Sequence, residues 1–169
     1  MENPGPLPSP PTIGDSQTAI LSAPAQDPRA QFARLELERG IKNGANWFYW
    51  IAGLSLVNSV MALSGSATHF VLGLGITQIF DGLAQGMGSG AGLAVAVVLD
   101  LLAAAALVLF GVFANKRHTW TFVVGMALYA LDGLIYLIAQ EWLGVGFHAF
   151  VLFCLFRGFK ACRALNAVP

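Results

Sequence analysis

A stretch of 24 residues, 91–114, is apolar throughout except for one charge, Asp100. The hydrocarbon core of a bilayer is about 30 Å thick, and a helix that rises 1.5 Å per residue needs about 20 apolar residues to cross it. Composition agrees, because 56% of the residues are hydrophobic and 11% are charged, against roughly 25% charged residues in soluble domains. The sequence therefore predicts an all-α integral membrane protein.

Three further segments have the length and apolar character of membrane spans, namely residues 44–63, 119–139 and 142–161. The loops that join the last three spans are only a few residues long, which makes consecutive spans antiparallel neighbours. The predicted fold is a four-span antiparallel helical bundle over residues 44–162.

The regions outside the bundle differ sharply in composition. Residues 1–28 hold seven of the eight prolines, and such a segment cannot bury enough apolar surface to offset its ordering entropy. We interpret it as a disordered cytoplasmic tail, with a proline-motif ligand as the alternative. Residues 29–43 carry charges of both signs at helical spacing and predict a juxtamembrane charged helix. Residues 163–169 are interpreted as a cytoplasmic C-terminal tail.

Residues 69–85 are ambiguous, because they are apolar but about as short as a span can be. Their apolar residues fall on one helical face, while Thr77, Gln78, Asp81 and Gln85 fall on the other. This pattern predicts a short interfacial or re-entrant helix between the first two spans. The alternative is that the segment crosses the bilayer as a fifth span.

Basic residues decide between four and five spans. All nine fall in three clusters, which are Arg29, Arg34, Arg39 and Lys42; Lys116 and Arg117; and Arg157, Lys160 and Arg163. Four spans place all nine on the cytoplasmic side, whereas five spans place the last five outside. The positive-inside rule therefore favours four spans, with both termini on the cytoplasmic side. The predicted location is a bacterial inner membrane.

Aromatic residues flank the predicted spans at the positions where headgroups would lie. Trp and Tyr favour this level, because an apolar ring and a polar tip can both be satisfied there. The predicted interface anchors are Trp47, Tyr49, Trp50, Trp120 and Trp142.

Four polar residues, one from each predicted span, lie at membrane depth: Asn58, Asp100, Asp132 and His148. Helix geometry places them about 8–14 Å from the outer ends of their spans, so they could form one buried layer. Two hypotheses follow. The layer is a proton-titratable or cation-attracting site, or it is a set of structural hydrogen bonds between helices. Further candidates for the same cluster are Asp81, Tyr129 and Tyr136.

The sequence contains no recognisable enzyme motif. Its three histidines are dispersed and no zinc-binding spacing is present, so we predict no catalytic residue, metal or cofactor. The short basic clusters adjoin apolar segments, which argues against nucleic-acid binding. Two function classes remain. One is a non-enzymatic accessory, scaffold or assembly subunit with another membrane protein as partner. The other is a proton- or cation-linked transport or channel protomer, acting as a homo-oligomer through Asp100, Asp132 and His148.

Overall fold

The computed structural model describes residues 27–63, 74–87 and 90–167. Five helices account for these ranges: α2 (Pro28–Leu63), α3 (Gly75–Met87), α4 (Gly90–Asn115), α5 (Thr119–Ile138) and α6 (Trp142–Asn166). The predicted all-helical class is confirmed for this part of the chain. Almost all of the predicted disordered tail, the first five residues of segment 69–85 and the side chain of Asp81 lie outside the described residues.

Helix α2 joins two segments that the sequence analysis treats as separate, the charged helix 29–43 and the span 44–63. No proline follows Pro28 within this stretch, so nothing removes a backbone donor and forces the helix to end. The bounds of α4 and α5 match the predicted spans within one residue, while α6 extends five residues further and includes most of the predicted C-terminal tail.

Three helices are long and apolar enough to cross a membrane: Ala94–Asn115, Thr119–Ile138 and Trp142–Asn166. Large apolar side chains face outward along them, such as Leu102 and Leu131, each 61% exposed. Outward-facing leucine is typical of a surface that meets lipid. Helix α2 is not among the three, because the asparagines and serines between positions 46 and 59 lower its hydropathy, and the predicted span 44–63 is therefore not confirmed.

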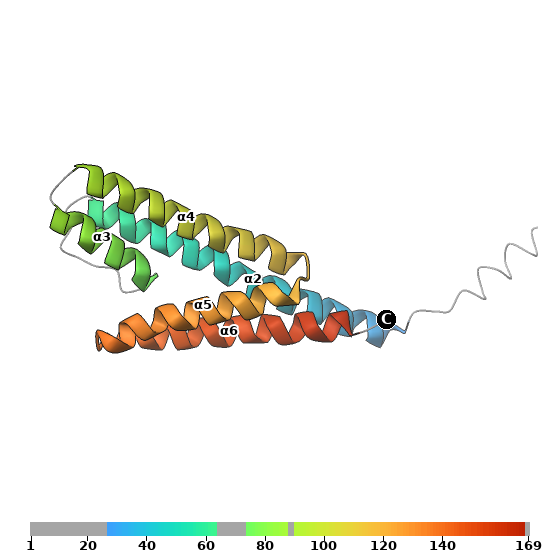
Figure 1. The fold of residues 1–169 in the computed structure, drawn as a ribbon. Helices are drawn as coiled ribbons and strands as arrows, with labels where there is room; N and C mark the ends of the chain where they lie inside the picture. Colours follow the sequence, from blue (N-terminus) through green and yellow to red (C-terminus); the bar gives the residue numbers. More distant parts are fainter. Residues whose placement is uncertain (1–26, 64–73, 88–89, 168–169) are drawn as a thin grey trace, which may run out of the picture. The chain divides into compact units, whose positions relative to one another are not determined.

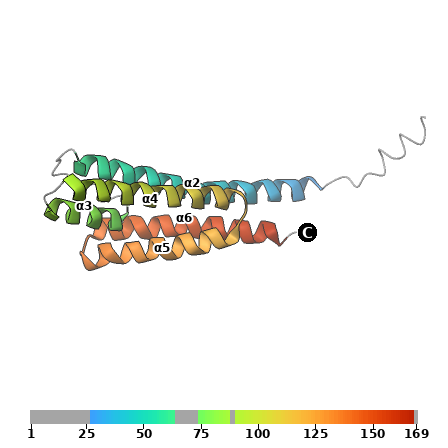
Figure 2. The ribbon, with the colours of Figure 1, turned by 45° about the horizontal axis from the view of Figure 1, so that its top comes forward.

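Helices α4, α5 and α6 alternate in direction, and tight turns join them. Arg117 and Gln140 occupy these turns with positive φ angles of 66° and 59°, the left-handed conformation that often ends a helix. Helices α2 and α4 lie side by side, as do α5 and α6 (Figures 1 and 2). Helix α3 lies beside α4 and α5, at the end of the bundle where α4 begins (Figure 1).

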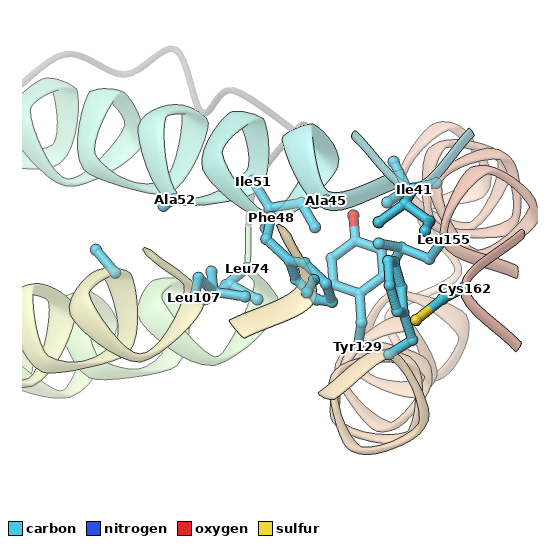
Figure 3. Packing of buried hydrophobic residues seen from close by; sticks show 14 of the residues in the cluster. Ile41, Ala45, Phe48, Ile51, Ala52, Leu74, Leu107, Tyr129, Leu155 and Cys162 are labelled. Atoms are coloured by element: carbon cyan, nitrogen blue, oxygen red, sulfur yellow. The ribbon is translucent and has the colours of Figure 1, made fainter. Parts of the chain in front are cut away.

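Glycines allow the helices to approach closely at several places, of which Gly44 and Gly125 are two. A Cβ on Gly44 would lie 2.6 Å from the Cα of Gly158, so the backbones of α2 and α6 are in direct contact there. A Cβ on Gly125 would lie 2.4 Å from the ring of Phe48. Phe48 is completely buried and packs near Tyr129 in the hydrophobic core, at the centre of Figure 3.

Candidate intramembrane polar site

The four polar residues predicted to form a layer are all buried. Asn58 is 7% exposed, Asp100 2%, Asp132 6% and His148 2%. Asn58, Asp132 and His148 lie five or six residues from the nearest end of their helices, which corresponds to about 8–9 Å, and Asp100 lies ten residues into α4, or about 15 Å. The described hydrogen bonds of these residues fall into two groups, one around Asp132 and one around Asp100.

The first group centres on the carboxylate of Asp132, which binds the start of helix α3. The backbone N–H of Gly75 donates to Asp132 Oδ2 at 2.8 Å, and the N–H of Ile76 donates to Oδ1 at 2.9 Å. The first N–H groups of a helix have no partner within the helix, and its N-terminus carries a partial positive charge. Asp132 on α5 therefore caps α3 from a position 57 residues later in the chain.

His148 on α6 completes the surroundings of this carboxylate. Its Nε2 lies 3.0 Å from Asp132 Oδ2, and its Nδ1 lies 2.9 Å from the carbonyl oxygen of Gly144, one turn earlier on α6. A carbonyl oxygen only accepts, so Nδ1 carries a proton and donates it.

Two features of the surroundings are electrostatically complementary to this pair. The carboxylate already accepts two N–H bonds from a helix N-terminus, which stabilises negative charge on Asp132. The imidazole lies between two tyrosine rings, stacked on Tyr129 at 4.3 Å and tilted against Tyr136 at 4.8 Å between ring centres. Aromatic faces attract a cation, which stabilises positive charge on His148.

Helix α3 is also held by α2 and by Tyr136. The N–H of Leu74, immediately before α3, donates to Ser55 Oγ on α2 at 3.0 Å. The side-chain amide of Gln78 donates to the Tyr136 hydroxyl at 2.9 Å, and Thr77 is completely buried. Thr77 and Gln78 thus face the other helices, while Ile79 is 42% exposed.

The surroundings of Asp132 on its outer side are apolar. A hollow of about 340 Å³ between α3, α4 and α5 borders Asp132 and Tyr129, and the rest of its lining consists of apolar residues such as Leu107, Leu128 and Ile135. In a bilayer, this hollow would open towards acyl chains rather than water.

The second group surrounds Asp100 on α4 and has far fewer hydrogen bonds. Ser59 Oγ on α2 lies 2.6 Å from Asp100 Oδ2 and 3.2 Å from the carbonyl oxygen of Ser55. Asp100 Oδ1 is buried without a hydrogen-bond partner in the described part of the chain, and the same holds for both amide atoms of Asn58. Asp100 is thus a buried carboxyl group with a single serine partner.

The predicted interface anchors take up different positions. Trp50, Trp120 and Trp142 are 64%, 53% and 72% exposed. Trp47 is half-buried and packs edge-on against Phe150 at 5.3 Å, and the Tyr49 hydroxyl accepts a hydrogen bond from the Asn115 amide at 3.3 Å.

Several contact residues of the site were not among the sequence candidates. Ser55 and Ser59 are small hydroxyl residues within the predicted span 44–63, and Gly75 and Ile76 contribute backbone groups, which no residue type indicates. The one available signal was that Ser55 and Ser59 share a helix face with Asn58 and Ala62.

Comparisons with protein-family models, with curated proteins and with solved structures find no match for this chain. Among the described residues, no group of three His, Cys, Asp or Glu side chains is arranged to hold a metal ion. Three of the described helices are long and apolar enough to cross a bilayer, which is compatible with a membrane-embedded helical protein.

Proposed function

We propose that the chain spans a bacterial inner membrane four times, through α2, α4, α5 and α6. Both termini then lie on the cytoplasmic side. The supporting observation for α2 is its contact with the apolar helices over most of its length. Gly44 touches α6, Phe48 packs over Gly125 of α5, and Ser59 reaches Asp100 of α4. A helix in contact with three membrane-crossing helices must lie at the same depth as they do.

Helix α3 is proposed to be re-entrant rather than interfacial. A helix lying on the membrane surface turns its polar side to water and its apolar side to lipid. In α3, the buried Thr77 and the half-buried Gln78 face the bundle, and the N-terminus ends on buried Asp132. Non-helical backbone at membrane depth is tolerated where protein satisfies its polar groups, and half-helices in transporters end at the midplane in the same way.

Cysteine labelling in intact cells tests this topology. Both native cysteines are replaced by serine, and one exposed turn residue at a time, Lys116 or Gln140, is changed to cysteine. A membrane-impermeant maleimide is expected to label Gln140→Cys from outside and Lys116→Cys only after the cells are permeabilised. Labelling of Lys116→Cys in intact cells would contradict the four-span arrangement.

The function that the site supports best is that of a non-enzymatic accessory, scaffold or assembly subunit of the membrane. The observation that carries this proposal is the saturation of Asp132, whose two oxygens bind two N–H groups and an imidazole. A carboxylate that must keep these bonds to hold α3 in place is not free to exchange protons or cations. The Asp132–His148 pair is therefore proposed to be structural, and the partner is another membrane protein or a second copy of this chain.

A second function, proton- or cation-linked transport by an oligomer, is favoured by Asp100. A hydroxyl group has one proton, so Ser59 can donate either to Asp100 or to the Ser55 carbonyl, but not to both. When it donates to the carbonyl, Asp100 has to supply the other proton as a carboxylic acid. Ionised Asp100 would have one hydrogen bond and an unpartnered oxygen, which a bound cation or water could satisfy.

Proteoliposomes separate the two functions. For an accessory subunit, an imposed pH gradient is expected to decay at the same rate with and without the reconstituted protein. For a transporter, the wild type would dissipate the gradient and Asp100→Asn would abolish this activity. Glu141→Gln, which neutralises an exposed carboxyl in the α5–α6 turn, is the matched control and would leave any transport unchanged. Dissipation that persists in Asp100→Asn would exclude Asp100 as the site.

A further inference from the structure

A groove of about 400 Å³ lies between α2 and α6, away from the Asp132 and Asp100 groups. Its polar lining includes Asn43, Asn46 and Arg157, and its aromatic lining is Trp47 and Trp50. The groove lies next to the place where Gly44 of α2 contacts Gly158 of α6. The glycine contact fixes the distance between the two helices, so the groove is part of the packed fold.

The groove carries one unpaired positive charge. Arg157 lies over the ring of Phe153 at 6.0 Å, and no carboxylate of the described residues is within ion-pair distance of it. The neighbouring Asn43 and Asn46 side chains are exposed and carry amide N–H donors, and the two tryptophans carry indole N–H donors. Several N–H donors and one guanidinium, with no acidic residue in the lining, are suited to a phosphate group.

The depth of the groove identifies the source of that phosphate. Arg157 lies 15 residues after Trp142, or about 22 Å along α6, in a hydrocarbon core about 30 Å thick. If Trp142 lies at the outer interface, the Arg157 side chain reaches the headgroups of the cytoplasmic leaflet. Trp47 and Trp50 belong at the same level, where tryptophan is enriched.

We infer that this groove binds the headgroup phosphate of an anionic glycerophospholipid such as phosphatidylglycerol, from the cytoplasmic leaflet. The groove complements a single negative charge, because its only charged residue is Arg157. It lacks a carboxylate that could pair with the ammonium group of phosphatidylcholine or phosphatidylethanolamine, which disfavours zwitterionic lipids. The inference rests on the proposed topology for the leaflet, whereas the binding itself is measured without it.

Native mass spectrometry of the full-length protein in detergent tests this site. Titration with dioleoyl phosphatidylglycerol is expected to give one tight adduct, and Arg157→Gln is expected to weaken it about tenfold or more, because a hydrogen-bonded charge pair is lost. Asn46→Ala is expected to weaken it by less. The matched control is Arg163→Gln, which removes the same charge from α6 outside the groove and is expected to leave the adduct unchanged.

Titrations with a second lipid and with inorganic phosphate identify the ligand. Dioleoyl phosphatidylcholine is expected to bind at least about tenfold more weakly than phosphatidylglycerol, and inorganic phosphate at millimolar concentration is expected not to displace the lipid. Equal losses for Arg157→Gln and Arg163→Gln would indicate diffuse attraction and overturn the site. Displacement by inorganic phosphate would overturn the lipid as its ligand. Unfolding curves of each variant in detergent confirm that a lost adduct does not reflect a lost fold. A topology that differs from the proposed one would change the leaflet but not these affinities.

Discussion

Replacing Asp132 by alanine is expected to lower the free energy of unfolding by about 3–5 kcal/mol, the range found when one partner of a buried ion pair is removed. The substitution removes the acceptor for two N–H groups of α3 and leaves His148, which is 2% exposed, without its carboxylate partner. An isolated interhelical hydrogen bond in a membrane contributes roughly 0.6 kcal/mol, so an effect of several kcal/mol would mark Asp132 as a charged cap rather than one bond among many.

Denaturation in mixed micelles, followed by circular dichroism, measures this effect. Leu131→Ala is the matched control, since Leu131 neighbours Asp132 but is 61% exposed and faces outward, and a loss below about 1 kcal/mol is expected there. His148→Ala and the double variant complete a double-mutant cycle. Because the two side chains act as one pair, the double variant is expected to lose clearly less than the sum of the single variants. Additive losses would contradict the pairing.

The substitution Gly44→Ala is expected to cost about 3 kcal/mol of unfolding free energy, at the upper end of the usual range for overpacking. The added methyl group would lie 2.6 Å from the Cα of Gly158 and 3.2 Å from its backbone nitrogen. Backbone atoms cannot change rotamer to make room, so α2 and α6 would have to separate. The ring of Phe122, also 3.2 Å away, limits movement in the other direction.

Gly53→Ala on the same helix is the matched control. A Cβ at Gly53 meets nothing within 4 Å, and alanine has a higher helix propensity than glycine. Unfolding in micelles is therefore expected to show destabilisation for Gly44→Ala and no loss, or a small gain, for Gly53→Ala. Similar losses for both variants would mean that the cost reflects the backbone conformation of glycine rather than close helix packing.

Helix existence and approximate bounds were predictable from sequence, because long apolar runs leave few alternatives to a membrane helix. The predicted spans 91–114 and 119–139 agree with α4 and α5 within one residue at each end, and the predicted span 142–161 begins where α6 begins. Burial of Asp100 and Asp132 followed from their depth within the predicted spans. The continuity of α2 was missed, because a change from charged to apolar composition was interpreted as a break between elements.

The contacts of the candidate site were only partly predictable. The pairing of Asp132 with His148 was predictable from sequence. Asp132 lies six residues before the end of α5 and His148 lies six residues after the start of α6, so the two are at the same level of adjacent antiparallel helices. The other partners of Asp132 are backbone N–H groups, and every residue except proline carries one, so no residue type indicates them. The contact of Gly44 with Gly158 was missed for a different reason. Gly44 is the first residue of the predicted span 44–63, and no sequence pattern pairs it with Gly158.

The capping of α3 by Asp132 constrains the order in which the protein can assemble during synthesis. When α2, α3 and α4 have left the ribosome, the N–H groups of Gly75 and Ile76 still lack their acceptor, which is made more than 50 residues later. Unpaired N–H groups are costly to hold in hydrocarbon, so in the proposed re-entrant position α3 would not be stable inside the membrane at that stage. In that arrangement, α3 is expected to remain at the membrane surface or in the insertion machinery until α5 has been synthesised. Helix α5, which is made after α2, α3 and α4, therefore supplies the polar contacts that the start of α3 lacks.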